Sequence, residues 1–201
     1  GATGDGGAAA DASLANPWAI TLDDQGNLFI ADSVVSNHRI RMVDAATGIV
    51  ITVAGTSSQG FSGDGGPATS ASLRNPIGLA VDANGNLFIA DSGNHRVRLV
   101  DASTGVISTV AGGGSDFPGD EGPATSTVLG DVSDATLDSQ GNLYMADPSY
   151  GRVRRVNVST GMITTVAGDG SFGFSGDGGE ATIASLSSPK GIAIDVEGDL
   201  F

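Results

Sequence analysis

The sequence predicts an all-β fold in which one four-stranded antiparallel sheet is repeated along the chain. Three observations support this: short apolar runs, turn residues between them, and recurrence of the whole pattern. The clearest copy contains the runs Ile77–Val81, Leu87–Ala90, Val97–Val100 and Val106–Val110. Each run has the length of a strand and is rich in Ile, Val, Leu or Phe, the residues that favour strands.

The links between these runs are short, which favours pairing of consecutive strands. The first link holds Asn84–Gly85, a two-residue hairpin signal because these residues accept positive φ. The second link holds Ser92-Gly93-Asn94 followed by His95, and the third holds Thr104–Gly105. Four strands joined in this way form an antiparallel meander.

The pattern recurs at near-constant spacing, which is the signature of a repeat architecture. The aspartate after the first strand occurs as Asp23, Asp82, Asp138 and Asp195. The aspartate of the glycine-rich loop before each unit occurs as Asp5, Asp64, Asp120 and Asp177. The predicted units are about 17–55, 76–112 and 132–168, with the start of a fourth at 189–201.

Apolar residues on both faces of these strands predict that each sheet is covered on both sides. Four-stranded meanders that pack face to face around an axis make a β-propeller. The predicted fold is therefore an all-β propeller of four-stranded antiparallel blades, of which about three and a half are present. A β-helix is the structural alternative, but its coils are shorter and lack Asn-Gly hairpins.

Several motifs resemble the NHL repeat. They are Pro76-Ile77-Gly78, Ala90-Asp91-Ser92, Asn94-His95-Arg96, Val110-Ala111-Gly112 and the second tripeptide Asn37-His38-Arg39. The long loop resembles the GDGGPA-type variant of bacterial NHL arrays and teneurin-like propellers. This resemblance implies a ring of typically about six blades.

The two ends of the chain interrupt the repeat pattern. One blade face covers roughly 300 Å², and leaving it exposed forgoes on the order of 8 kcal/mol. We therefore expect the chain to be part of a ring completed by remaining blades of the same protein. Self-association through the open blade faces is the alternative. Any targeting segment would lie outside this sequence.

Composition disfavours two classes of partner. The net charge is −14, with only nine Lys plus Arg residues, so neither nucleic acid nor an anionic membrane surface is an expected partner. No apolar run approaches the ~20 residues needed to insert into a bilayer. The absence of cysteine removes disulfides, zinc–thiolate sites and cysteine catalysis.

The loops between units, about twenty residues long, are expected to fold back onto the sheets. Each of three loops carries a Phe three residues before its aspartate (Phe61, Phe117, Phe174) and a Leu downstream (Leu73, Leu129, Leu186). These apolar side chains are predicted to pin the loop. Thr69–Leu73 and its equivalents are predicted to form one helical turn.

The links between second and third strands lie on the same side as the long loops, and this loop-rich side is the predicted binding face. Departures from the repeat near the start of the innermost strand add further candidates. The candidate ligand-binding residues are Trp18, His38, His95, Asp131, Asp134, Tyr150 and Lys190. Packing differences between blades are the competing interpretation of these departures.

The glycine-rich loops and the histidines offer possible metal ligands. Asp64, Asp120 and Asp177 are candidate ligands for Ca²⁺, but turns in which the aspartate accepts nearby backbone N–H groups are favoured. A histidine site for Zn²⁺ is disfavoured because the third unit has Tyr150 at the position of His38 and His95. Aspartates that end the second strands (Asp32, Asp91, Asp147) are predicted to pair with arginines that begin the third (Arg39, Arg96, Arg152).

The predicted function is a non-enzymatic binding scaffold for a protein or glycan. It is expected to belong to a larger exported bacterial protein, extracellular or periplasmic, with no cofactor. No catalytic residues are identified. The alternative is a Ca²⁺- or Zn²⁺-dependent hydrolase or lyase with its metal in the propeller channel.

Overall fold

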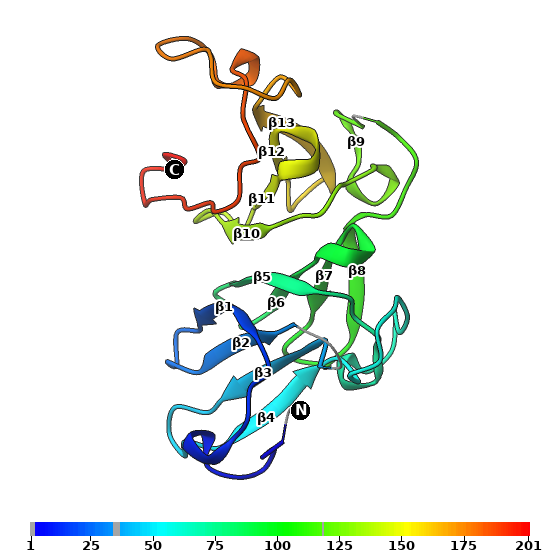
Figure 1. Cartoon of the computed structure of the whole chain (residues 1–201), viewed down its shortest axis with the longest axis vertical. Coiled ribbons are helices and arrows are strands. Elements are labelled where there is room, and N and C mark those ends of the chain that lie inside the picture. The colour runs from blue at the N-terminus through cyan, green and yellow to red at the C-terminus, as the bar shows by residue number, and fades with distance from the viewer. Residues whose placement is uncertain (1–2, 34–36, 118) are drawn as a thin grey trace. The chain divides into compact units, whose positions relative to one another are not determined.

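The computed structural model describes residues 3–33, 37–117 and 119–201, which form two compact units. The first unit comprises residues 1–94 and 98–109, and the second comprises residues 95–97 and 110–201. Figure 1 shows the strands of each unit in chain order.

Three sheets contain four consecutive strands each, as the meander predicts. The first sheet is β1 (Pro17–Leu22), β2 (Leu28–Asp32), β3 (Arg39–Val43) and β4 (Val50–Ala54). The second is β5 (Pro76–Val81), β6 (Leu87–Asp91), β7 (Arg96–Val100) and β8 (Ile107–Gly112). The third is β10 (Asp134–Leu137), β11 (Leu143–Asp147), β12 (Arg152–Val156) and β13 (Met162–Ala167), with the short β9 (Gly122–Pro123) added beside β13. The predicted all-β fold of antiparallel four-stranded sheets is confirmed.

The link between β5 and β6 is longer than the expected two-residue hairpin. It runs from Asp82 to Asn86, and Oδ1 of Asp82 accepts the backbone N–H groups of Asn84 (2.9 Å) and Asn86 (2.8 Å). Gly85 supplies the expected positive φ of +81°. The aspartate side chain thus closes the turn, a role that the Asn-Gly signal alone does not reveal.

The core of the first unit lies between its two sheets. Phe29, Ala31 and Ile40 of the first sheet pack in one buried cluster with Leu79 and Ile89 of the second. Strand β5 contacts both β1 and β2. Apolar residues therefore cover the facing surfaces of both sheets within this unit.

Each long loop returns to the outer strand of the sheet that it precedes. The backbone N–H groups of Gly6, Gly65 and Glu121 donate to the carbonyls of Val50, Ile107 and Ile163, each at 2.8 Å. The loop then forms a single 3-10 turn, at Ala9–Asp11, Ala68–Ser70, Ala124–Ser126 and Ala181–Ile183. The predicted folding back is confirmed, and the loop covers the backbone groups of an otherwise open edge.

The leucines and phenylalanines of the loops behave differently. Leu73 and Leu129 are buried, as predicted. Phe61, Phe117 and Phe174 are exposed, so they do not anchor the loops by burial. The ring of Phe61 instead lies under the guanidinium of Arg98, 4.8 Å from its Cζ.

Residues 189–201 form only an isolated antiparallel bridge between Ile194 and Leu200. Within the described ranges, no helix has the length and apolar character needed to cross a membrane.

Candidate functional site

A buried arginine in the third strand of each sheet holds the glycine-rich loop. The Nη2 atom of Arg98 lies 2.6 Å from Oδ1 of Asp64, and that of Arg154 lies 2.9 Å from Oδ1 of Asp120. Arg41 forms the same ion pair with Asp5 in the first sheet. Sequence reasoning missed these pairs, although Arg41, Arg98 and Arg154 recur at one position of the repeat.

These ion pairs occupy two of the three carboxylates considered as calcium ligands. The second oxygen of Asp64 accepts the hydroxyl of Thr109 at 2.7 Å, and that of Asp120 accepts Thr165 at 2.9 Å. The aspartates are therefore held by side chains of the sheet, not by the local backbone N–H groups that were expected. Asp177, the third candidate, is exposed.

The aspartates that end the second strands are fully buried. Oδ1 of Asp91 accepts the N–H of Arg74 at 2.7 Å, and Oδ2 accepts Asn94 Nδ2 at 2.8 Å. Its ion pair is with Arg98, at 3.4 Å, two residues further along β7 than the expected Arg96. Burial raises the pKa of Asp91 above its ordinary value despite these hydrogen bonds. These aspartates fasten the loop to the sheet.

The two histidines have different environments. His38 is buried, and its Nδ1 accepts the N–H of Asn75 at 3.2 Å. Burial lowers the pKa of His38, so its neutral form is favoured. His95 is exposed, and its Nδ1 lies 3.2 Å from Oδ1 of Asp131. The structure thus brings together two predicted candidates, His95 and Asp131, whereas His38 serves packing.

Asp134 and Lys190 take part in hydrogen bonds between the start of β10 and residues 190–192. Oδ2 of Asp134 accepts the N–H of Ile192 at 3.2 Å, and the Lys190 carbonyl accepts the Ser133 hydroxyl at 2.8 Å. Burial raises the pKa of Asp134. Both residues therefore hold the segment after the third sheet.

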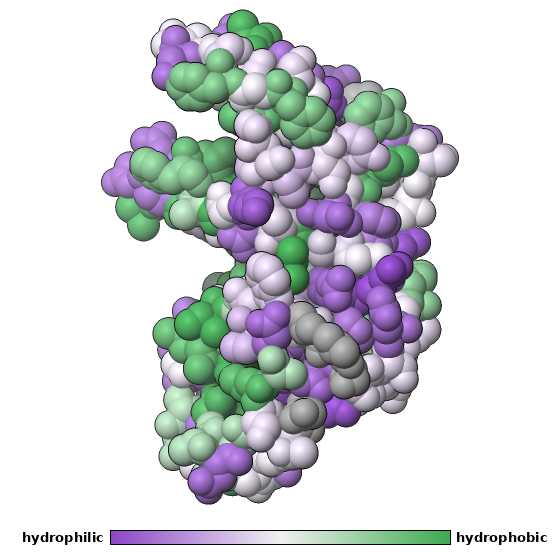
Figure 2. Space-filling model, in the orientation of Figure 1, coloured by the Kyte–Doolittle hydropathy of each residue, from purple (hydrophilic) through white to green (hydrophobic). Residues whose placement is uncertain are grey.

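Trp18 lies at a register irregularity of β1 with its side chain exposed, and Ile20 and Leu22 further along the strand are also exposed. Figure 2 shows hydrophobic residues gathered over this side of the first unit. Trp18 therefore belongs to an exposed apolar stripe of the sheet, not to a pocket with other candidates.

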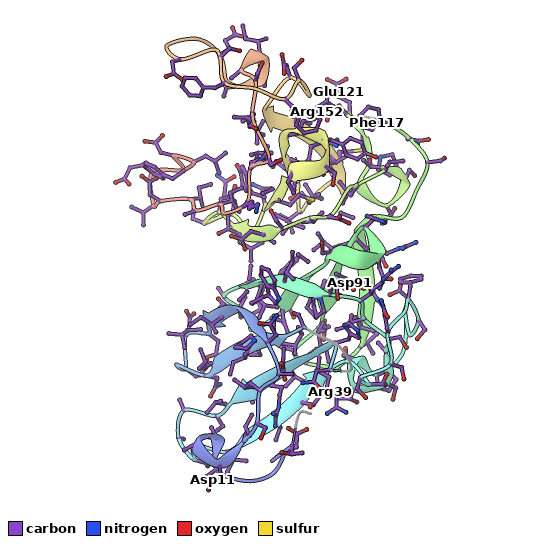
Figure 3. All side chains as sticks on the ribbon, in the orientation of Figure 1. Asp11, Arg39, Asp91, Phe117, Glu121 and Arg152 are labelled. Atoms are coloured by element: carbon purple, nitrogen blue, oxygen red, sulfur yellow. The ribbon has the colours of Figure 1, made fainter. Side chains whose placement is uncertain are left out.

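Tyr150 lies in a cluster of aromatic and arginine side chains in which Phe117 is exposed and Tyr150 and Arg152 are half-buried. Its ring centroid is 4.6 Å from that of Phe117, and Cζ of Arg152 lies 5.6 Å from the Phe117 centroid. Figure 3 shows Phe117 and Arg152 close to Glu121. A depression of about 440 Å³ adjoins the cluster, lined by Arg152 with Asp120, Glu121 and Asp169 among others. We call Phe117, Tyr150 and Arg152 the aromatic cluster.

Sequence reasoning selected Tyr150 because it replaces a histidine of the repeat, but it missed its partners. Phe117 was assigned to loop packing, and Arg152 to a pair with Asp147. In the described part of the chain, no group of three or more His, Asp or Glu side chains is arranged to hold a metal ion. What the cluster offers chemically is an exposed aromatic ring beside a guanidinium and several carboxylates.

Comparison with protein families gives two matches. The model of the NHL repeat matches residues 73–98, and the model of the teneurin NHL domain matches residues 1–62.

Similar curated proteins are much longer than this chain. Teneurin-1 of Mus musculus is 30% identical over 223 aligned residues, covering 98% of this chain and 8% of that protein. Protein SUPPRESSOR OF QUENCHING 1, chloroplastic, of Arabidopsis thaliana is 36% identical over 104 residues, covering 52% of this chain and 10% of that protein. NHL repeat-containing protein 2 of Homo sapiens is 35% identical over 111 residues, covering 52% of this chain and 14% of that protein.

Solved structures share the fold at low sequence identity. A protein of unknown function from Bacteroides thetaiotaomicron has a TM-score of 0.67 and 22% identity, over 92% of this chain and 43% of that chain. Hydrazine synthase of Kuenenia stuttgartiensis has a TM-score of 0.60 and 17% identity, over 94% of this chain and 42% of that chain. Identities this low carry information on the fold alone.

Proposed function

The chain belongs to the NHL-repeat family, and from this premise we propose that it is a non-enzymatic scaffold that binds a protein partner. The proposal places the contact surface on the loop-rich side of the third sheet, at the aromatic cluster. Aromatic residues and arginine are enriched in protein interfaces and supply most of their binding energy.

The observation that supports this most is the exposure of Phe117. More than half of its surface is accessible although its ring packs against that of Tyr150 at a tilt of 50° and lies under Arg152. An exposed aromatic ring that is held in place by its neighbours loses little conformational entropy when a partner covers it. The carboxylates of Asp120, Glu121 and Asp169 around the adjoining depression favour a partner with basic side chains.

Site-specific photocrosslinking tests this proposal. Benzoylphenylalanine is introduced at Phe117, or at Phe174 as the matched control from the equivalent loop position, in the full-length protein in its source cells. We expect a discrete protein adduct from position 117 that disappears with Tyr150→Ala or Arg152→Ala. Equal adducts from positions 117 and 174, or retention of a glycan in place of a protein, would contradict the proposal.

Export to the extracellular or periplasmic space is part of the same proposal. It is supported by the match of residues 1–62 to the teneurin NHL model, because this region carries the glycine-rich loop variant. Fractionation of the source cells with an antibody against the chain tests it, and recovery in the cytoplasmic fraction alone would contradict it. No observation on the described residues favours the hydrolase or lyase alternative.

We further propose that the exposed face of β1 packs against another four-stranded sheet, from further repeats of the protein or from a second copy. Ile20 of β1 is 67% exposed, whereas Leu79, at the same position of β5, is 6% exposed because the first sheet covers it. The two strands have the same pairing register, so their faces are equivalent. An apolar face of this kind gains free energy when it is covered.

Sedimentation of the 201-residue chain tests this. Association that rises with concentration is expected, and Ile20→Asp should abolish it while Val158→Asp, at an isolated exposed position, should not. A monomer at every concentration with a cooperative thermal transition would refute the proposal.

A further inference from the structure

An apolar groove of about 450 Å³ lies within the first unit, on the side of the short hairpin links. Phe29, Met42 and Ile51 of the first sheet form one wall, and Leu87 and Val100 of the second sheet belong to the other. Its volume falls in the range of roughly 300–1,000 Å³ typical of small-molecule pockets.

The apolar row that forms the first wall is not repeated in the third sheet. Phe29, Met42 and Ile51 are paired neighbours across β2, β3 and β4, so they form one row on one face. The same row of the third sheet consists of Tyr144, Arg155 and Thr164. A sheet of this family therefore forms with a polar and cationic row, and packing within the sheet does not require the apolar one.

The rim of the groove carries negative charge. Asp23 and Asp101 line it, and no Lys or Arg is among its lining residues in the described part of the chain. Oδ1 of Asp101 accepts hydrogen bonds from Ser103 and Thr104, which lower the pKa of Asp101 and keep it ionised at neutral pH. Asp23 is fixed in its turn by the backbone N–H groups of Gln25 and Asn27. Both carboxylates are thus held in place at the mouth of an apolar groove.

We infer that this groove binds a small amphipathic amine, with its hydrocarbon portion against Met42 and Ile51 and its ammonium group beside Asp101 and Asp23. The apolar wall stabilises the hydrocarbon by removing it from water. The rim carboxylates favour a cationic head group over a neutral or anionic one, since they attract a positive charge and repel a negative one. The net charge of −14 adds to the same preference.

Titration by NMR with three probes of equal chain length tests the site. Octylammonium, octan-1-ol and octanoate are added separately to the ¹⁵N-labelled chain at neutral pH. We expect saturable shifts of the backbone amides of Met42, Ile51 and Ala102, with affinity falling in the order amine, alcohol, carboxylate. A rim carboxylate that is open to solvent is expected to contribute a factor of roughly two to five to amine affinity.

Two variants introduce the residues that stand at the equivalent positions of the third sheet. Met42→Arg copies Arg155 and should reduce octylammonium binding at least tenfold. Asp101→Asn copies Asn157, whose Oδ1 accepts the N–H groups of Ser159 and Thr160 in the equivalent turn, so the turn is kept while the charge is lost. It should weaken amine binding about two- to fivefold and leave octan-1-ol unchanged. Asp44→Asn, the same change in a turn that does not line the groove, is the control.

Three results would overturn the inference. The first is equal affinity for octylammonium and octanoate. The second is shifts that do not saturate or that spread over the exposed β1 face instead of the groove. The third is loss of amine affinity in Asp44→Asn that matches the loss in Asp101→Asn. Because none of these variants alters the aromatic cluster, their outcome is independent of the photocrosslinking result.

Discussion

Arg98 donates from Nη2 to Oδ1 of Asp64 across 2.6 Å, and its side chain is completely buried while the carboxylate is partly exposed. The same guanidinium reaches Asp91 through Nη1. One arginine therefore joins the glycine-rich loop, the end of β6 and the centre of β7. Arg41 and Arg154 form the same ion pair with the loop aspartate, Asp5 or Asp120, in the other two sheets.

Replacing Arg98 by methionine should destabilise the chain strongly. The change leaves Asp91 buried without its cation, and breaking a buried pair in this way costs about 3–5 kcal/mol. The free energy of unfolding from urea denaturation measures the loss. Arg74→Met, at an exposed arginine, should change it by less than about 0.5 kcal/mol. A similar small effect at both positions would show that the buried guanidinium does not hold the loop.

The pH dependence of stability should reveal the burial of Asp91. The pKa of Asp91 is raised in the folded state. At pH values between the unfolded pKa of about 3.9 and the folded pKa, the unfolded chain therefore binds fewer protons than the folded chain. Asp91 therefore contributes stability at low pH that is lost as the pH rises through its folded pKa. Relative to Asp91→Asn, the wild type should lose stability as pH rises.

Asp44 provides the opposite sign as a control. Hydrogen bonds from Thr47 lower the pKa of Asp44 in the folded state. The wild type should therefore gain stability relative to Asp44→Asn as pH rises through the unfolded value of about 3.9. Urea denaturation across this pH range measures both differences. Equal slopes for the two comparisons would contradict the assignment of a raised pKa to Asp91.

The fold was predictable because its signals are local and repeated. The spacing of Asp82 and its equivalents, together with runs such as Leu87–Ala90, specified the strands and their order. The ion pair between Arg98 and Asp64 could not be predicted in this way. The two residues are 34 positions apart, and nothing in the local sequence shows that they meet. The aromatic cluster was only half predicted: Tyr150 departs from the repeat, whereas Phe117 keeps its repeat position and so gave no signal.

The loops should be anchored by leucine and not by phenylalanine. Leu73 is fully buried between the sheets of the first unit, whereas Phe61 is exposed. Leu73→Ala should cost about 2–5 kcal/mol, because the substitution leaves a cavity. Phe61→Ala should cost less than about 1 kcal/mol, since the ring is exposed and lies against Arg98 at the surface of the sheet. Chemical denaturation of both variants measures this, and a larger loss for Phe61→Ala would contradict it.

Calcium should not stabilise the chain. Both oxygens of Asp64 already accept hydrogen bonds, from Arg98 and Thr109, and the arginine neutralises its charge. A hard cation that needs six to eight oxygen ligands would have to displace these donors. We expect equal midpoints of thermal unfolding in calcium chloride and in EDTA. A higher midpoint in calcium that disappears in Asp64→Asn would instead support a calcium site in the loop.

Two glycines with the same sign of φ should respond differently to alanine. Gly112 and Gly65 have φ of +83° and +80°, so a side chain is strained at either position. A Cβ at Gly112 would lie 2.2 Å from the carbonyl oxygen of His95, whereas a Cβ at Gly65 meets no atom within 4 Å. Gly65→Ala should therefore cost about 1 kcal/mol, and Gly112→Ala several times more because the backbone of β8 must move away from His95. The two free energies of unfolding, measured side by side, decide this. Equal losses of unfolding free energy would mean that backbone strain alone, and not the close approach of the His95 carbonyl to β8, accounts for glycine at position 112.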